Sequence, residues 1–475
     1  MERAGAPDYD VCHGSYTEEG VSGYMRDELI KVKPFEFIDY LEITGNQAFG
    51  SHGTLKITGH ILAEKEQEYI SLMTDETWVH VDAVTYDGVT KHVFKGIILD
   101  ADIEKVGETC VLTLNLITGS FLMDTARHIR SFQDDGISYD SMLSVITGEY
   151  RNSAYKMTAG QGSTIPGFVL QYNETDWEFA KRLASHFGTD IYPDSAYEGT
   201  KIYFGEPDAG AGAEISTNEY SVVKRNQESM CYAVRWRELY HIGEWLQFNG
   251  MPMWIAGIET KLDGGELYHT YHLVQKNEIK TEERHNEKCV GASLTGTVLA
   301  VEKDKVQVEL EKDENKDRAG KRWFLYATPY SSPDGTGWYC MPEVGDRIRL
   351  RIPSDHEGEA YVISSVHMDS ADGSERQNPD FKSIMNKQGK EILFTPKSLI
   401  MTNNAGMSIE ILDDEGIKIM SDKDITISAA DSIEITSATS KLELYAKENL
   451  LLQQGDTQMT MDGQMRVNGA RLNLN

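Results

Sequence analysis

The sequence predicts a mainly β protein with a helical interruption, a small closed barrel and a C-terminal β-helix that several chains build together. Three observations carry this prediction. Apolar and polar residues alternate at period two over residues 35–118, short strands crowd residues 294–369, and apolar pairs recur every eight or nine residues after residue 389. A chain of 475 residues is also too long for one ordinary core, so about three domains are expected.

The charge balance excludes one class of partner. The chain carries 46 basic and 76 acidic side chains, a formal net charge of -30. Such a surface repels the phosphates of nucleic acids and of anionic membranes. We therefore expect no nucleic-acid partner.

Cysteine usage and the N-terminus bear on where the chain folds. The five cysteines are odd in number and widely spaced, so they form neither a disulfide framework nor a metal-binding knuckle; they are Cys12, Cys110, Cys231, Cys289 and Cys340. The first residues lack the apolar core of a signal peptide, and no run of about 18 apolar residues follows anywhere. We expect a protein made in the cytoplasm without a signal peptide.

Residues 1–34 are interpreted as an N-terminal segment and residues 35–287 as the first domain. Strand-like alternation is clearest at the end of its first part, where the apolar side chains share one face of a half-buried strand and a β-barrel is expected. These side chains are Cys110, Leu112, Leu114 and Leu116. Strand texture returns after about residue 201.

Helical periodicity interrupts this β texture over residues 121–188. Its clearest helix has sharp ends, since Thr175 can cap it, Glu178 completes a capping box and Gly188 suits the left-handed position after its C-terminus. The packing face of this helix is predicted to consist of Trp177, Ala180, Leu183 and Phe187.

Residues 290–370 predict a compact unit of about five strands, the size of a small closed barrel of the oligomer-binding type. A charged loop, residues 311–322, interrupts it. Residues 371–388 are polar and are interpreted as a linker.

Residues 389–475 carry the repeat. Each repeat offers two or three apolar side chains, too few for one chain to enclose a core, whereas three chains around a common axis can turn these side chains inward. A spike of three intertwined chains is therefore predicted, and helix is the alternative for residues 441–455. The predicted spike core is Ile417, Ile419, Ile425, Ile427, Ile433, Ile435, Leu442, Leu444, Leu450, Leu452, Met459, Met461 and Val467.

Three segments resemble one family in the same order along the chain. QYNETDWEFAKRLASHFG at residues 171–188 is similar to the signature of the VgrG and phage late-control-protein family, the central hub of contractile tails. GWYCMPEVGDRIRL at residues 337–350 resembles the small barrel that joins hub to spike there, and the repeats resemble the family's triple-stranded β-helix needle. The resemblance implies a hub of two β-barrels, with the helical segment inserted between them.

The resemblance also implies a function. It indicates a homotrimeric structural protein at the tip of the inner tube of a contractile injection system, one that pierces the target cell envelope. Implied partners are inner tube and baseplate proteins at the hub end, a PAAR-type tip protein at the C-terminal end and effector cargo. A phage tail, a tailocin, a type VI secretion apparatus and an extracellular particle remain open. The alternatives are a tail-associated cell-wall hydrolase and a trimeric adhesin fibre.

No segment predicts a catalytic, cofactor or metal site. GQGSTIPG at residues 160–167 lacks the following Gly-Lys of a phosphate loop and is interpreted as a turn. DENKDRAG at residues 313–320 opens like a calcium loop but has Arg318 where glycine is needed, so a solvated surface loop is expected. His269 and His272 would point to opposite faces of a strand, and the last 80 residues contain no histidine.

Overall fold

The computed structural model describes residues 29–85, 88–165, 167–207, 212–224, 230–276, 278–367 and 378–471. The chain divides into two compact units, Met1–Met368 and Asp369–Asn475. Within these described ranges, no helix has the length and apolar character needed to cross a bilayer.

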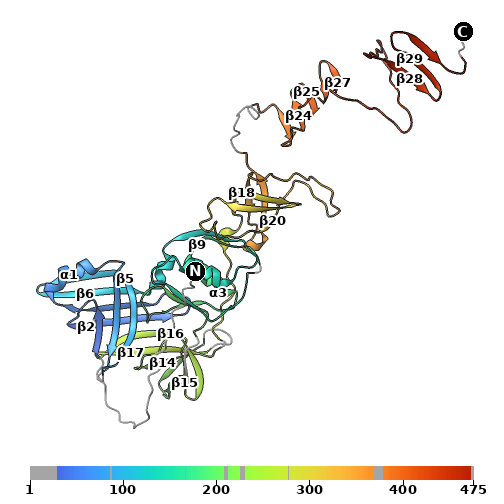
Figure 1. The fold of residues 1–475 in the computed structure, drawn as a ribbon. Coiled ribbons are helices and arrows are strands. Elements are labelled where there is room, and N and C mark those ends of the chain that lie inside the picture. Colours follow the sequence, from blue (N-terminus) through green and yellow to red (C-terminus); the bar gives the residue numbers. More distant parts are fainter. Residues whose placement is uncertain are drawn as a thin grey trace, which may run out of the picture. The chain divides into compact units, whose positions relative to one another are not determined.

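A twelve-stranded sheet forms the body of the first unit (Figure 1). Ten of its strands follow the order β1-β4-β5-β6-β3-β2-β16-β17-β14-β13, and β15 joins β12 to β16. The strands are β1 (Leu29–Lys33), β2 (Asp39–Ala48), β3 (Thr54–Ile61), β4 (Trp78–Val84), β5 (Thr90–Val106), β6 (Thr109–Ile117), β12 (Glu214–Ile215), β13 (Tyr220–Lys224), β14 (Met230–Trp236), β15 (Trp245–Phe248), β16 (Met251–Asp263) and β17 (Glu266–Val274).

Two apolar cores lie on this sheet. One gathers side chains of β1 to β6 and of a short helix, α1 (Glu66–Leu72), which follows the 3-10 turn η1 (Ala63–Lys65) and was not predicted. The other gathers side chains of β14 to β17. The predicted alternation in β6 is confirmed, because Cys110, Leu112, Leu114 and Leu116 are all buried.

The two halves of the large sheet are joined more closely than two separate barrels would be. Strand β2 pairs antiparallel with β16, with Ala48 opposite Gly257 and Thr44 opposite Lys261, so one hydrogen-bonded sheet spans both cores. The predicted N-terminal segment 1–34 also needs correction, because β1 lies in it and pairs with β4 along its whole length. Residues 1–28 of that segment, and Cys12 with them, lie outside the described residues.

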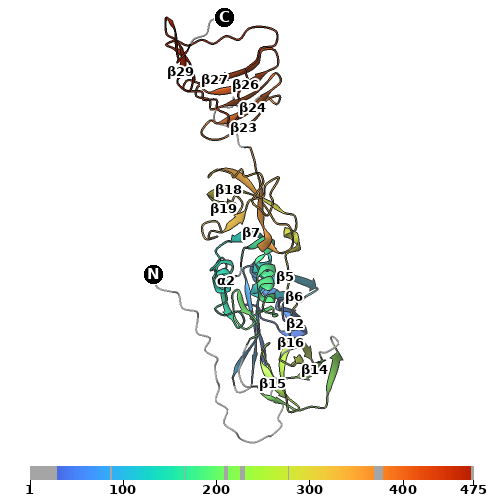
Figure 2. The same cartoon turned by 90° about the vertical axis from the view of Figure 1, so that its right-hand side faces the viewer.

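Between β6 and β12 the chain forms the predicted helical insertion, which also contains strands. Its elements are η2 (Gly119–Asp124), β7 (Arg127–Phe132), α2 (Tyr139–Thr147), β8 (Ala154–Met157), β9 (Val169–Thr175), α3 (Asp176–Ser185), β10 (Ile191–Pro193) and β11 (Lys201–Phe204). A third core lies here, and it buries Trp177, Ala180 and Leu183 with Phe187 at its edge, as predicted. Figures 1 and 2 both show the insertion between the large sheet and the small barrel.

The small barrel follows the 3-10 turn η3 (Glu287–Cys289). Its five strands lie in the order β20-β19-β18-β21-β22, and a parallel bridge between Tyr326 and Val362 joins the two ends of the sheet. The five strands and the closure expected for this unit are present, and its oligomer-binding type stays a prediction. The elements are β18 (Ser293–Glu302), β19 (Lys305–Leu310), β20 (Trp323–Leu325), β21 (Arg347–Arg351), the 3-10 turn η4 (Glu357–Glu359) and β22 (Tyr361–Ser365).

The second unit contains two antiparallel sheets, and none of its described residues is buried in the single chain. A single layer of short strands has no second layer to cover it, which explains the exposure. Figure 2 shows the strands of the first sheet side by side. The strands are β23 (Lys382–Met385), β24 (Glu391–Thr395), β25 (Ser398–Thr402), β26 (Ser408–Leu412) and β27 (Gly416–Met420), then β28 (Leu450–Gln454), β29 (Thr457–Met461) and β30 (Met465–Asn468).

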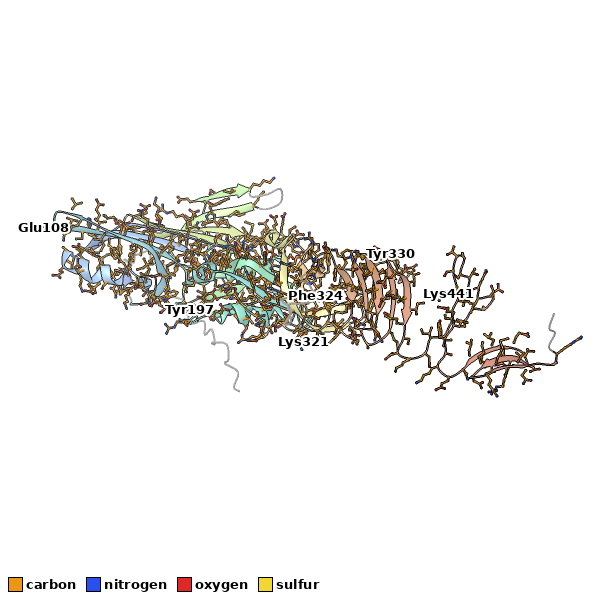
Figure 3. All side chains as sticks on the ribbon, turned by 90° about the horizontal axis from the view of Figure 1, so that it is seen from above. Glu108, Tyr197, Lys321, Phe324, Tyr330 and Lys441 are labelled. Carbon is orange, nitrogen blue, oxygen red and sulfur yellow. The ribbon has the colours of Figure 1, made fainter. Side chains whose placement is uncertain are left out.

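Two expectations for the C-terminal region are corrected. Strand β23 lies inside the predicted linker 371–388, so the sheet begins before residue 389. The helical alternative for residues 441–455 is wrong, because those residues are irregular up to β28. Figure 3 labels Lys441 in this stretch, where the side chains project from an extended trace.

Candidate functional site

The insertion and the small barrel share one apolar core. Strands β7 and β9 pair with each other. Phe168, which directly precedes β9, and Leu170 of β9 pack among buried barrel side chains. The ring of Phe168 meets that of Phe324 edge to face, with 5.2 Å between centroids. Because apolar burial favours the docked state, the small barrel is fixed to the insertion and is not connected to it by a flexible linker alone.

Helix α3 places a buried arginine beside this core. The capping box at the start of α3 is present as predicted: the side chain of Thr175 accepts from the backbone of Glu178, and the side chain of Glu178 accepts from the backbone of Thr175. Gly188 beyond the helix has φ of +68°, the left-handed value expected for it. With its ends fixed in this way, α3 places Arg182 in the contact between the insertion and the small barrel, which we term the junction. Arg182 is 3% exposed there.

Arg182 bridges the insertion and the barrel. Its Nε and Nη2 donate to the two oxygens of Glu174 at 2.9 and 2.8 Å, and Nη1 donates to Glu357 of η4 at 2.7 Å. Nη2 also donates to the carbonyl of Leu170 at 3.0 Å. A guanidinium donates along fixed directions, so these contacts orient η4 relative to α3.

Burial decides the proton affinities in this group. Desolvation raises the pKa of Glu174 and outweighs the lowering by Arg182. Burial alone would lower the pKa of Arg182, but Glu174 and Glu357 outweigh it and raise that pKa, so the guanidinium stays charged. The junction therefore depends on a buried cation placed between two carboxylates.

A second buried arginine, Arg130 of β7, organises the other side of the junction. Its Nη1 donates to Asp176 at 2.5 Å and to Gln171 at 3.0 Å, while Nη2 lies 2.8 Å from Glu149. The acceptors of His128, Glu149 and Asp176 lie within 4.8 Å of one another, a spacing compatible with a metal ion. The guanidinium of Arg130 contacts all three of these groups, and we interpret them as an ion-pair network.

The charged loop at residues 313–320 corrects the sequence-based expectation. Asp313 and Asn315 are 6% and 5% exposed, so the loop is not simply a solvated surface loop. Oδ1 of Asp313 accepts from the backbone N–H of Ser131 at 2.9 Å, and Nδ2 of Asn315 donates to the carbonyl of Ser131 at 2.8 Å. The backbone N–H of Glu314 donates to the carbonyl of Ile129 at 2.9 Å. The loop thus supplies hydrogen-bond partners to the backbone of β7 along the edge that does not pair with β9.

Glu314 gives the junction a measurable pH dependence. Desolvation acts to raise the pKa of Glu314, but hydrogen bonds from His128 and from the backbone of Ile129, with the charge of Arg130, together lower it. A carboxyl whose folded-state pKa is lowered contributes stability above its ordinary pKa and loses it as the pH falls through the folded value.

We expect Glu314→Gln to lower the free energy of unfolding by about 1 kcal/mol at pH 7, a modest loss because the side chain is partly exposed. The difference from the wild type should shrink towards zero in acid. Urea titrations at pH 7 and pH 3 measure it, with Glu311→Gln as a matched control in an exposed ion pair with Arg347. A difference that grew in acid would contradict the assignment.

A triad-like group, which the sequence did not reveal, lies at η2. Nδ1 of His52 is 2.8 Å from Oγ of Ser120, and Nε2 is 3.5 Å from a carboxylate oxygen of Asp124. Ser120 is only 1% exposed and its hydroxyl also bonds Thr118 at 2.9 Å, so it is not presented to a substrate. The ring of His52 lies 4.1 Å from that of Trp177, which indicates a packing role.

The histidine pair of β17 lies as the strand period predicts. His269 is buried beside Thr260, with 3.0 Å between Nδ1 and Oγ1, and burial lowers its pKa to about 4. His272 occupies the other face, with Nε2 2.9 Å from a carboxylate oxygen of Glu259. The two rings do not converge on a common ligand. Of the turn GQGSTIPG, Pro166 lies outside the described residues.

The structure places the predicted spike residues on and between the C-terminal strands. Ile417 and Ile419 lie on β27, Leu450 and Leu452 on β28, Met459 and Met461 on β29 and Val467 on β30, whereas Ile425, Ile427, Ile433, Ile435, Leu442 and Leu444 lie in residues 421–449, outside any strand. The isoleucines and Leu442 and Leu444 are 53–70% exposed. Their inward position thus stays a prediction about an assembly.

The fold of this chain is similar to the folds of known proteins, although its sequence is not. No family model and no curated protein matches the sequence. The E. coli c3393 protein, described as a type VI secretion component structurally similar to the T4 tail proteins gp27 and gp5, is 13% identical; the match covers 71% of this chain and 100% of c3393, with a TM-score of 0.52.

Two structures of PdpA–VgrG complexes also match, of which the lidded one is from Francisella. A chain of the lidded form is 9% identical over 82% of this chain and 80% of its own length, with a TM-score of 0.57. A chain of the lidless form is 10% identical over 83% and 98%, with a TM-score of 0.53. At these identities the likeness shows the fold alone: the chain has a β-rich fold similar to that of the c3393 protein and of the matched chains of the PdpA–VgrG complexes.

Proposed function

We propose that this chain is the hub and spike of a contractile injection system, a homotrimer at the tip of the inner tube that pierces the target envelope. The observation that supports this most is the exposure of the repeat: residues such as Ile417 and Ile427, each 70% exposed, have no cover in the single chain. Large aliphatic side chains recurring at fixed intervals are costly to leave in water. Three copies around an axis cover them.

The proposed mechanism is mechanical. Contraction drives the tube forward, and the spike concentrates the force on a small area of membrane. In an intertwined spike no strand can leave without disturbing two other chains, so unfolding is slow, and under impact the unfolding rate matters more than the equilibrium free energy. The buried junction around Arg182 carries the load from spike to hub.

The proposed partners are those that the family resemblance implies. Tube and baseplate proteins bind the hub, a PAAR-type protein caps the C-terminal end, and effector cargo travels with the spike. The PdpA–VgrG structures show that a protein of this fold is found in complex with another protein.

Native mass spectrometry of the purified full chain tests the trimer. We expect a species with three times the mass of the chain at micromolar concentration. Removing residues 382–475 should leave a folded monomer that no longer resists heating in detergent, because every buried residue of the described chain lies before residue 368. A stable full-length monomer would contradict the proposal, and a truncated protein as resistant as the whole would contradict the spike.

The two rivals make different predictions. A cell-wall hydrolase needs an accessible nucleophile or acid–base pair, and the buried Ser120 is not one. A zymogram on peptidoglycan with the wild type and with Ser120→Ala tests directly whether the chain hydrolyses cell wall and whether Ser120 takes part. A trimeric adhesin would bind a glycan array through a terminal head, whereas a spike would not.

A further inference from the structure

The small barrel exposes a group of large apolar side chains at the end of β20 and on the loop between β20 and β21. Leu325, Tyr330, Trp338 and Tyr339, which we term the aromatic surface, are 55%, 57%, 50% and 75% exposed. All four line one hollow of about 740 Å³ between β20 and the loop before β21. Figure 3 labels Tyr330 of this group and Phe324, the buried neighbour of Leu325 on β20.

The aromatic surface is held in a fixed shape. The backbone N–H of Trp338 donates to the carbonyl of Tyr330 at 2.8 Å, and the hydroxyl of Tyr339 donates to the carbonyl of Lys303 at 2.9 Å. Gly337 has φ of +152°, and a Cβ there would lie 2.5 Å from the carbonyl oxygen of Tyr330. Ordered, exposed aromatic rings lose little conformational entropy on binding, which makes them effective interface residues.

The chain itself indicates what covers this surface. Strand β22 ends at Ser365 and β23 begins at Lys382. Three copies joined in the proposed spike therefore hold three small barrels on tethers of at most about 60 Å. Such tethers give an effective concentration in the millimolar range, at which even a weak apolar contact forms.

We propose that the aromatic surface of each copy packs against a second copy of this chain, so that the small barrels add a contact between copies to the contacts of the spike strands. This inference rests on the proposed trimer and names one surface within it. It makes the loop between β20 and β21 an assembly element, in addition to the repeat.

Cys340, next to Tyr339, provides the probe. It is exposed, whereas the other three cysteines in the described ranges, Cys110, Cys231 and Cys289, are buried. A Cys12→Ser background removes the remaining thiol. We expect a short bismaleimide to link the full-length trimer into covalent dimers, seen after complete denaturation, and Cys340→Ser to abolish them.

Trp338→Ser combined with Tyr339→Ser should slow this cross-linking about tenfold, because the aromatic contact between the barrels is then lost, while the native mass stays trimeric. Tyr197→Ser, at an exposed tyrosine of the hub, is the matched control and should change nothing.

The outcomes separate the two proposals. A monomer by native mass would overturn the proposed function. A trimer in which Cys340 reacts freely with a monofunctional maleimide and forms no covalent dimer would overturn this inference and leave the trimer standing. In that case the aromatic surface would face a different protein.

Discussion

Replacing Arg182 with alanine should lower the free energy of unfolding of the hub and barrel by about 3–5 kcal/mol, the range for breaking a buried ion pair on one side. The variant leaves Glu174 and Glu357 facing each other without their shared cation. Urea unfolding followed by tryptophan fluorescence measures the loss.

The pH dependence of this loss has a defined sign. Burial already raises the pKa of Glu174, and removing Arg182 removes the group that opposes this rise. A carboxyl with a raised folded-state pKa binds its proton more tightly when folded, so the variant gains stability as the pH falls. The deficit relative to wild type should therefore be largest at neutral pH and smaller at pH 5.

Two further variants make the Arg182 experiment decisive. Arg347→Ala breaks an exposed pair with Glu311 and should cost at most about 1 kcal/mol. Arg182→Met combined with Glu174→Gln and Glu357→Gln removes all three charges and should recover much of the loss. Equal costs for Arg182→Ala and Arg347→Ala would show that the junction does not depend on its buried cation.

Ile427→Asp should abolish the heat- and detergent-resistant trimer. Ile427 is 70% exposed in the single chain and is predicted to line the spike axis, so the trimer would bury three carboxylates in one layer. Each buried, unpaired charge costs several kcal/mol, and like charges at one level repel one another. Gel electrophoresis with and without boiling measures the resistant fraction, and native mass gives the oligomer.

The neighbouring position supplies the control for this layer. Successive side chains of a strand point to opposite faces, so Thr426→Asp places the same charge on the outside. Thr426→Asp should keep the resistant trimer. If both variants kept it, or both lost it, the period-two assignment of residues 421–449 would be wrong.

The sequence predicted those parts of the fold that depend on local periodicity. The burial of Leu112 and Leu114, the capping box at Thr175 and the closed barrel over residues 290–370 follow from patterns within a few residues. The pairing of β2 with β16 was not predicted, because no local pattern specifies which distant strand edge meets which.

The contacts of the junction could not be predicted from the sequence for the same reason. Arg182 and Glu357 are 175 positions apart, and nothing near either residue indicates the other. Asp313 and Asn315 were expected at the surface because polar loop residues usually lie there. Their burial depends on the open edge of β7, which belongs to a different part of the chain.

The single sheet of the hub has a consequence for biosynthesis. Strand β2 cannot complete its pairing until β16 has left the ribosome, some two hundred residues later. At roughly 5–20 residues per second, this leaves the edge of β2 open for about 10–40 s. An open, partly apolar edge can pair with other nascent chains during that interval. Polysomes bring several copies of this chain close together, so its yield should depend strongly on chaperones that cover the first half of the hub during translation.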